Sequence, residues 1–393
     1  MNRRHFIRLI GGGCIAVATA PLLKSCSSDY PQDAIAAWAG PSAEADLQHW
    51  ALSHAILAPS PHNLQPWLVD LREANTITLY VDRSRLLPMT APHYRQIMIG
   101  QGTFIEALVL ALQERGVEAQ VTLFPYGESP PHQLDERPVA RIHWQLSSGT
   151  PTRDALFAQI LRRHTSKVDY DTTRLVPDEI LQALKSSQTN PDVHFDSTTA
   201  PARLNALRRL CWESALAEIR TPRTVMESLK LIRIGPHEIS MHRDGISINA
   251  PVPRALDALG GFDRSQPPAE GSQAFQQMSS HFAGYSRSAM GFVWLSTPTA
   301  ANAATKRLRA AEVAAGRAYM RLQLKATELG LQMHPMSQAP QEFTEMQPYY
   351  ERLHSLLLGK PASIETVQMF CRIGYGSNTP PEPRRSVTDI ILA

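Results

Sequence analysis

A proline-rich loop at residues 58–67 presents three polar side chains from a stiff backbone. It reads Ala-Pro-Ser-Pro-His-Asn-Leu-Gln-Pro-Trp. Because proline fixes φ and lacks an N–H, the prolines hold this chain extended and remove competing donors. Ser60, Asn63 and Gln65 then remain for hydrogen bonding, and the Asn63 amide can donate and accept at once. The pattern suits the alternating carbonyl and N–H edge of a planar heterocycle. A rigid turn with Trp67 in the core explains it equally well.

A second polar segment gathers hydrogen-bond donors at the end of a predicted amphipathic helix, 153–163. It contains Arg163, His164, Thr165 and Lys167 within five residues. Cationic side chains beside a hydroxyl are typical of sites for a phosphate monoester. The alternative is a solvated basic helix end, which the helix dipole favours.

Several other chemistries lack their motifs. No GxxxxGK[ST] phosphate loop is present, and Gly374-Tyr375-Gly376 runs into Ser-Asn-Thr-Pro-Pro, which begins no helix. The sequence at 284–288, Gly-Tyr-Ser-Arg-Ser, lacks the closing glycine of a nucleophile elbow. The 14 histidines include no His-x-His or HExxH spacing, so we expect no metal site.

Composition favours a large folded core without a nucleic-acid surface. The 393 residues are 43% hydrophobic, which excludes disorder as the whole account. The net charge of +3 comes from the first 25 residues, which carry four basic and no acidic side chains. The remainder has 35 basic and 36 acidic side chains, so we expect no nucleic-acid partner.

Residues 1–26 have the pattern of an export signal. A charged start precedes an apolar, Gly- and Ala-rich stretch from Leu9 to Leu23, too short for a good membrane-spanning helix. The segment Asn2-Arg3-Arg4-His5-Phe6-Ile7 resembles the twin-arginine signal, which implies passage through the Tat translocase to the periplasm as a folded protein, often with cofactor inserted. An ordinary Sec signal or anchor is the alternative.

Lipid anchoring after export stays open. The segment Leu23-Lys24-Ser25-Cys26 partly resembles a lipobox, from which Lys24 departs. Lipidation of Cys26 would anchor the protein to a membrane, and residues 27–43 are predicted as a polar tether. Cys211 and Cys371 are too few for a disulfide framework.

Hydrophobic periodicity predicts two successive series of elements. The first comprises a helix at 44–57, strands at 67–71 and 77–82, a helix at 94–115, and strands at 119–124 and 139–146. The second comprises helices at 153–163, 178–187 and 201–219, a strand at 291–297, a helix at 303–329, an extended piece at 331–335 and a strand at 368–375. The Gly- and Pro-rich stretch 234–275 is predicted as irregular.

One internal sequence repeat, called the echo below, links the two series. Residues 102–116 align without a gap with residues 316–330, and both segments begin and end at glycine. Leu108 matches Leu322 and Glu114 matches Glu328. The pattern suggests a duplicated core helix, or two buried helices that share it by chance.

Five segments together resemble the FMN-dependent nitroreductase superfamily. Residues 58–67 look like its APSxxNxQPW loop, and residues 163–167 look like its RHSxK or RRSxR phosphate motif. Residues 316–335 resemble its late helix and strand, which lead to Met336, Ser337 and Gln338. Residues 372–376 and 383–387 resemble its closing strand and phosphate-binding arginines.

The resemblance implies FMN as cofactor, with the flavin carrying the chemistry and no catalytic side chain. The phosphate would be held by Arg163, Thr165, Lys167, Arg384 and Arg385. Ser60 and Asn63 would meet the ring and ribityl edge, and His164 and Gln65 are further cofactor-binding candidates. The main chain at Met336, Ser337 and Gln338 would lie near the reactive nitrogen, although Gln338 stands where glycine is common.

The order of these motifs implies a fused protein. In ordinary nitroreductases, which are dimers of shorter subunits, the phosphate motif precedes the QPW loop, whereas here it follows by about a hundred residues. The arrangement is similar to the Acg-like branch, in which two halves share one chain. It implies an α+β fold with a central mixed or antiparallel sheet flanked by helices. Half one would be 44–150 and half two 151–393, with one complete site, a lid at about 234–275, and a monomeric state.

The function implied is an exported FMN oxidoreductase that passes electrons by a ping-pong mechanism to a small organic acceptor, nitro or quinone-like. The electron donor stays unassigned, because free NAD(P)H is not expected outside the inner membrane. The alternative is a catalytically weak protein that binds or sequesters flavin.

Overall fold

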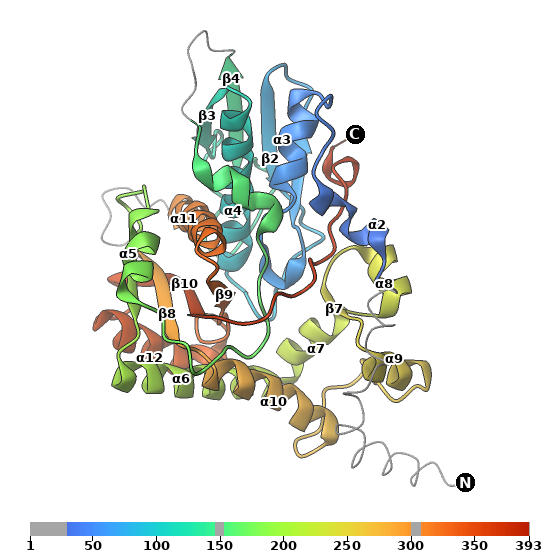
Figure 1. Cartoon of the computed structure of the whole chain (residues 1–393), viewed down its shortest axis with the longest axis vertical. Helices are drawn as coiled ribbons and strands as arrows, with labels where there is room; N and C mark the ends of the chain where they lie inside the picture. The colour runs from blue at the N-terminus through green and yellow to red at the C-terminus, as the bar shows by residue number, and fades with distance from the viewer. Residues whose placement is uncertain (1–29, 146–152, 300–307, 393) are drawn as a thin grey trace.

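The computed structural model describes residues 30–145, 153–299 and 308–392. The predicted export signal and Cys26 therefore lie outside the described residues. The protein contains two four-stranded sheets with helices packed around them (Figure 1). The predicted α+β class with antiparallel sheets flanked by helices is confirmed, with the sheet in two separate parts.

The first sheet belongs to the N-terminal part of the chain. Its strand order is β1-β2-β4-β3, and every pair is antiparallel. The strands are β1 (Trp67–Asp70), β2 (Thr76–Val81), β3 (Glu118–Leu123) and β4 (Ala140–Gln145). Helix α3 (Leu47–Ala55) precedes β1, and α4 (Arg95–Glu114) lies between β2 and β3 in sequence. These elements match the predicted first series within a few residues.

The second sheet repeats this topology. Its order is β5-β8-β10-β9, again with antiparallel pairs. The strands are β5 (His194–Thr198), β8 (Gly291–Pro298), β9 (Gln332–Pro335) and β10 (Glu365–Gly374). Helix α5 (Asp178–Ser186) precedes β5, and α11 (Leu308–Glu328) lies between β8 and β9 in sequence. In both sheets the four strands, numbered along the chain, stand in the order first, second, fourth, third.

Helices α4 and α11 cross at two glycines. A Cβ on Gly102 would lie 2.1 Å from the Val313 carbonyl oxygen, and a Cβ on Gly316 would lie 2.0 Å from the Ile99 carbonyl oxygen. Only glycine allows the two backbones to approach this closely. The aligned glycines of the sequence echo are therefore the reciprocal contact between the two halves.

The two central helices join the cores of the two halves. Val313, Met320 and Leu324 of α11 pack into the first core, whereas Tyr319 and Leu322 pack into the second. Helix α4 is the one described helix long and apolar enough to cross a membrane, and 89% of its apolar window is buried inside the protein.

The stretch 234–275, predicted as irregular, contains regular structure. It includes α8 (Gly235–His242) and α9 (Pro251–Ala258), and β6 (Ile232–Ile234) pairs in parallel with β7 (Ile246–Ile248). The prediction was wrong because Pro236 and Pro251 stand in the first turn of their helices, where proline is well accommodated.

Other elements also differ from the sequence-based expectation. Strand β5 and the helices α7 (Pro222–Lys230), α10 (Gln273–Arg287) and α12 (Gln347–Leu358) were not predicted. The helix predicted at 153–163 is a 3₁₀ helix, η5 (Ala155–Arg162), and α6 (Pro201–Arg220) matches its prediction. The segment predicted as a tether is helical from Gln32, with α2 (Gln32–Ile35) followed by η3 (Ala36–Ala39).

The C-terminal segment returns from the second half to the first. After β10 it runs back toward α2 and the first sheet (Figure 1). The Arg384 N–H donates to the Ala34 carbonyl, and the Leu392 N–H donates to the Val69 carbonyl at 2.8 Å. Residues near the C-terminus are thereby placed beside the loop that follows α3.

We predict that Gly102→Ala destabilises the protein through the helix crossing. The added methyl would meet backbone atoms of α11, so we expect the free energy of unfolding to fall by about 3 kcal/mol. Urea denaturation followed by circular dichroism measures this change. The control is Gly260→Ala, where a Cβ meets nothing within 4 Å and only the positive φ is unfavourable. Equal losses for the two variants would contradict the close crossing.

Candidate functional site

A single large cavity brings together most of the predicted site segments. It is lined by the loop after α3, by α4 and α11, by residues 163–167, by β9 and β10, and by the returning C-terminal segment. Its empty volume, including the part open to solvent, is about 1120 Å³. This is slightly above the range of about 300–1,000 Å³ for small-molecule and cofactor sites, as expected for a volume that includes open solvent.

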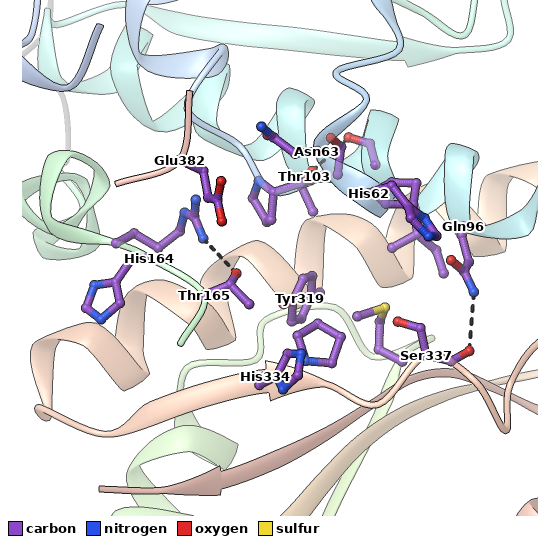
Figure 2. A pocket seen from close by; sticks show the side chains of 18 of the residues that line it. His62, Asn63, Gln96, Thr103, His164, Thr165, Tyr319, His334, Ser337 and Glu382 are labelled. Atoms are coloured by element: carbon purple, nitrogen blue, oxygen red, sulfur yellow. Dashed lines mark hydrogen bonds between the residues drawn. The ribbon is translucent and has the colours of Figure 1, made fainter. Parts of the chain in front are cut away.

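The cavity has two chemically different ends (Figure 2). His164, Thr165 and Glu382 lie at one end, and Gln96, His62 and Ser337 lie at the other. Thr103, Tyr319 and His334 lie between them. An elongated ligand with a charged head and a planar body would match this arrangement.

Two buried arginines define the charged end. Arg163 is 3% exposed and Arg384 is 4% exposed, and both donate to the Leu57 carbonyl, at 3.1 and 3.3 Å. Both guanidinium groups lie over the Trp38 ring, at 5.6 and 4.9 Å from its centre. Like charges are thus held side by side in a water-poor environment.

These guanidiniums have little counter-charge, because the Glu382 carboxylate at this end acts on Arg384 through its charge but forms no ion pair with it. Within the described residues neither forms an ion pair with a carboxylate, and the Nε atoms of Arg163 and Arg384 are buried without a hydrogen-bond partner. Burial, reinforced by the charge of Arg163, lowers the pKa of Arg384 to about 9. Since burying unpaired charge is costly, an anion bound here would supply the missing interactions.

The rest of the phosphate-type segment surrounds this pair. Thr165 Oγ1 lies 3.5 Å from a donor of Arg163, and His164 Nε2 is buried without a partner. Lys167 lies 3.8 Å from the Glu382 carboxylate and is partly exposed. The segment follows the end of η5, where the chain becomes extended at Arg163.

Asn63 connects the loop to the C-terminal segment. Its Nδ2 donates to the Pro383 carbonyl at 3.0 Å, and its Oδ1 accepts from Arg384 at 2.8 Å. Both ends of this amide are therefore engaged within the protein. Asn63 lines the cavity, but its main visible effect is to fix Arg384 in place.

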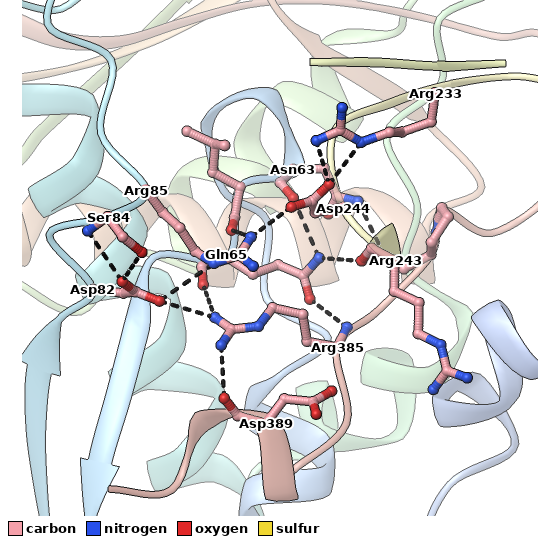
Figure 3. Close-up of polar contacts among 12 residues, drawn as sticks. Asn63, Gln65, Asp82, Ser84, Arg85, Arg233, Arg243, Asp244, Arg385 and Asp389 are labelled. Carbon is pink, nitrogen blue, oxygen red and sulfur yellow. Dashed lines mark hydrogen bonds and ion pairs between the residues drawn. The ribbon is translucent and has the colours of Figure 1, made fainter. Parts of the chain in front are cut away.

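The loop backbone is strained where it forms the cavity wall. His62, Asn63 and Gln65 have φ of 48, 52 and 52°, values that cost energy for residues other than glycine. Fully buried Gln65 stabilises this shape, because its Nε2 donates to the Arg243 carbonyl and its Oε1 accepts from the Arg385 N–H, both at 2.8 Å (Figure 3). Trp67 fills the core behind the loop.

Arg385 lies on the other side of the chain from Arg384. Its guanidinium donates to the carbonyls of Gln65 and Asp389 and lies 3.4 Å from the Asp82 carboxylate (Figure 3). It is not among the residues that line the cavity. Adjacent residues of an extended chain point in opposite directions, so only one of the two predicted arginines enters the site.

The end near Ser337 combines apolar surface and main-chain groups with the polar side chains of His62 and Gln96. Ser337 and Pro335 line the cavity beside Phe370 of β10, and the Ser337 carbonyl lies 3.5 Å from Gln96 Nε2. Met336 is 2% exposed and packs into the core, and the Gln338 side chain faces the buried carboxyl of Glu218. The predicted role of this main chain toward a flavin stays a prediction.

Eight of the twelve predicted site residues line the cavity, namely Ser60, Asn63, Arg163, His164, Thr165, Lys167, Ser337 and Arg384. The other four, Gln65, Met336, Gln338 and Arg385, lie behind its wall. The lining described for the cavity includes no residue of 234–275, the predicted lid.

Sequence reasoning missed Trp38, Thr103, Tyr319 and His334, which also line the cavity. Thr103 lies one position after Gly102 of the echo, and its hydroxyl donates to the Pro59 carbonyl at 2.7 Å. The echo could therefore have located Thr103. No local signal marks Trp38, whose indole N–H donates to the Glu382 carbonyl from the far end of the chain.

Comparisons with known proteins come from sequence and from structure. No protein-family model matches the chain. Over 87 residues, or 22% of this chain, it is 34% identical to a proposed NAD(P)H nitroreductase, Acg, from Mycobacterium tuberculosis, and this match covers 26% of Acg. An uncharacterised protein of the same organism is 31% identical over 129 residues, which cover 31% of this chain and 36% of the relative. The chain is similar to nitroreductases.

Solved structures with some likeness include further nitroreductases. A proposed nitroreductase from Anabaena variabilis aligns over 82% of each chain with a TM-score of 0.43 and 12% identity. The FMN-dependent nitroreductase NfnB from Mycobacterium smegmatis, in complex with NADPH, aligns over 58% of this chain and 92% of its own with a TM-score of 0.32 and 18% identity.

We predict that the cavity histidine His62 makes the protein less stable in acid. Burial, helped by the charge of Lys167, lowers the pKa of His62 to about 4. The unfolded chain binds this proton near pH 6.5, whereas the folded chain binds it only near pH 4. Neutral His62 therefore makes its full contribution to the free energy of unfolding above pH 6.5. It is lost as the pH falls toward 4.

Urea denaturation between pH 7 and pH 4.5 tests this. The variant His62→Asn, whose new residue tolerates a positive φ, should weaken the pH dependence in that range. The control His281→Asn changes an exposed histidine of α10 and should leave the dependence unchanged. An unchanged pH dependence in His62→Asn would show that His62 is not held neutral.

Proposed function

We propose that this protein binds FMN in the cavity, with the phosphate at the Arg163–Arg384 end and the ring toward Ser337. The observation that carries the proposal is the pair of buried guanidiniums with unpartnered Nε atoms and, within the described residues, no ion pair to a carboxylate; Glu382 at the same end pairs with Lys167. A phosphate dianion matches this donor set, because guanidinium groups bind phosphate through directed, charge-assisted hydrogen bonds. The sequence similarity to Acg supports the same cofactor class.

We propose a division of roles among nine of the twelve predicted residues. Arg163, His164, Thr165, Lys167 and Arg384 would hold the phosphate, with Trp38 beneath the two guanidiniums. Ser60 and Ser337 would flank the ring. Gln65 and Arg385 would act from behind the wall by holding the strained loop and the C-terminal segment in position.

We further propose that the chain is a fused, Acg-like nitroreductase in which one of two ancestral sites is lost. The repeated strand order and the reciprocal glycine crossing support the fusion. On the second half, Arg317 and Arg321 pair with Glu106, and Arg321 also pairs with Asp154. Arg317 aligns with Thr103 in the echo, so ion pairs occupy the place where a second cavity would lie. We therefore expect a monomer with one site per chain.

The proposed activity is electron transfer to a small organic acceptor, nitro or quinone-like. FMN, when bound, would supply the chemistry by accepting reducing equivalents in one half-reaction and releasing them in another. The chain's own residues would anchor the phosphate, shield the ring from water with the loop and β10, and leave the end near Gln96 and Ser337 for the acceptor. No side chain is assigned as a general acid or base. The electron donor is left unassigned.

We propose that the protein is exported by the Tat pathway and held at a membrane if Cys26 is lipidated. The support is the sequence pattern Asn2-Arg3-Arg4-His5-Phe6-Ile7 and the partial lipobox ending at Cys26. The substitution of both arginines by lysine should retain the protein in the cytoplasm on cell fractionation, whereas Cys26→Ser should release an anchored protein into the soluble periplasmic fraction. Unchanged export of the double-lysine variant would exclude the Tat assignment.

We predict that Arg163→Met and Arg384→Met each weaken FMN binding at least about tenfold, since charge-assisted hydrogen bonds to phosphate contribute roughly 1.5–3 kcal/mol. Fluorescence titration of the purified protein with FMN measures the affinity. The matched control is Arg162→Met, because Arg162 is exposed and donates to Gln159. Unchanged affinity in both variants would overturn the phosphate assignment.

Turnover distinguishes an enzyme from a flavin-binding protein. We predict that FMN-loaded protein, given NADPH, a reduced quinone or dithionite, reduces a nitroaromatic acceptor over many cycles. Absorbance of the flavin and of the acceptor measures this. If the flavin is bleached but none of the donors supports turnover of the acceptor, the result would instead support flavin sequestration.

A further inference from the structure

His334 lies in the middle of the cavity wall, between the charged end and the Ser337 end (Figure 2). It belongs to β9, and the residue opposite it on β10 is Arg372. The Arg372 Nε–H donates to His334 Nδ1 at 3.0 Å. His334 lines the cavity, but neither residue is among the twelve predicted site residues.

Arg372 is fixed on all sides. It is 0% exposed, and its Nη1 donates to the Tyr285 carbonyl and to Ser288 Oγ at 3.2 and 3.1 Å. Its Nη2 donates to the Val168 carbonyl at 2.7 Å, and the guanidinium lies 4.0 Å from the centre of the Tyr170 ring. This side chain has one position available, and in that position Nε points at His334.

This contact determines the protonation of His334. Arginine is charged at all relevant pH values and its nitrogens are donors only, so His334 Nδ1 must accept with its lone pair. A histidine that accepts at Nδ1 and is neutral carries its proton on Nε2. The second ring nitrogen is therefore a donor.

The surroundings keep the ring neutral. Burial lowers the pKa of His334 well below its ordinary value, and the charges of Arg372 and Lys167 lower it further. Tyr285 of α10 meets the ring edge-on at 5.2 Å. Within the described residues no carboxylate pairs with His334, and no protein group accepts a hydrogen bond from its Nε2.

We propose that His334 is a fixed, neutral Nε2–H donor to a hydrogen-bond acceptor on the bound ring, and that Arg372 is the positioning residue that sets its tautomer. This rests on the proposed binding of FMN. A donor beside Lys167 stabilises negative charge that develops on the ring, and, since the imidazole stays neutral, it does so without giving up or taking a proton. The contribution of this hydrogen bond to FMN binding should therefore not vary between pH 5.5 and 8.5.

The tautomer can be measured without FMN. We propose ¹⁵N NMR on the full chain labelled at histidine, with His334→Gln used to identify the His334 signals by difference. The expected spectrum shows an unprotonated Nδ1 and a protonated Nε2, unchanged from pH 5.5 to 8.5. A proton on Nδ1, or titration within that range, would overturn the inference even if FMN binds.

The role toward the ligand needs FMN as the probe. Adding FMN should shift the His334 Nε2–H signal, and His334→Phe should weaken FMN binding roughly two- to tenfold, the effect of one hydrogen bond. His334→Gln, which keeps an N–H donor, should retain part of the affinity, and His281→Phe on exposed α10 should retain all of it. In Arg372→Met, the His334 signals should show a mixture of both tautomers. If this variant does not fold, the wild-type spectrum is sufficient to test the tautomer.

The outcomes separate the two claims. If wild-type protein binds FMN but the Nε2–H signal stays in place and His334→Phe binds as tightly, the inference is wrong and the proposed function stands. If wild-type protein does not bind FMN, the proposed function is wrong, and the ligand role of His334 falls with it.

Discussion

The site depends on two positive charges buried side by side, Arg163 and Arg384, which share the Leu57 carbonyl as acceptor. Such a pair is unfavourable by itself, so neighbouring segments must hold it in place. Trp38 lies beneath both guanidiniums, and Asn63 accepts from Arg384. An anion bound beside the two guanidiniums would offset this cost.

The crossing of α4 and α11 makes this convergence geometrically possible. Because Gly102 and Gly316 let the helices touch, the loop after α3 and the strands β9 and β10 come within one ligand length of each other. The C-terminal segment then crosses from the second half to the first and brings Arg384 to the loop. Both halves of the chain contribute to the cavity wall, and Arg317 and Arg321 pair with Glu106, where we propose that a second site was lost.

The sequence predicts much of the fold because its strands alternate and its central helices are strongly apolar. It fails where prolines begin helices instead of ending them, as at Pro236 and Pro251. It finds Arg163 and the loop because their residue types are local and unusual. It cannot choose between Arg384 and Arg385, because the direction of each side chain depends on a contact with Gln65 more than 300 residues away. Trp38 and His334 were missed for the same reason, since their partners are distant in the chain.

The central claim is that the charged end of the cavity binds a phosphate attached to a flavin. The most direct test compares the affinities of the purified protein for FMN and for riboflavin, which differ only in the phosphate. We predict that FMN binds at least about tenfold more tightly, with one molecule per chain, as expected for charge-assisted hydrogen bonds from two arginines. Equal affinities, or no binding of either compound, would contradict the account.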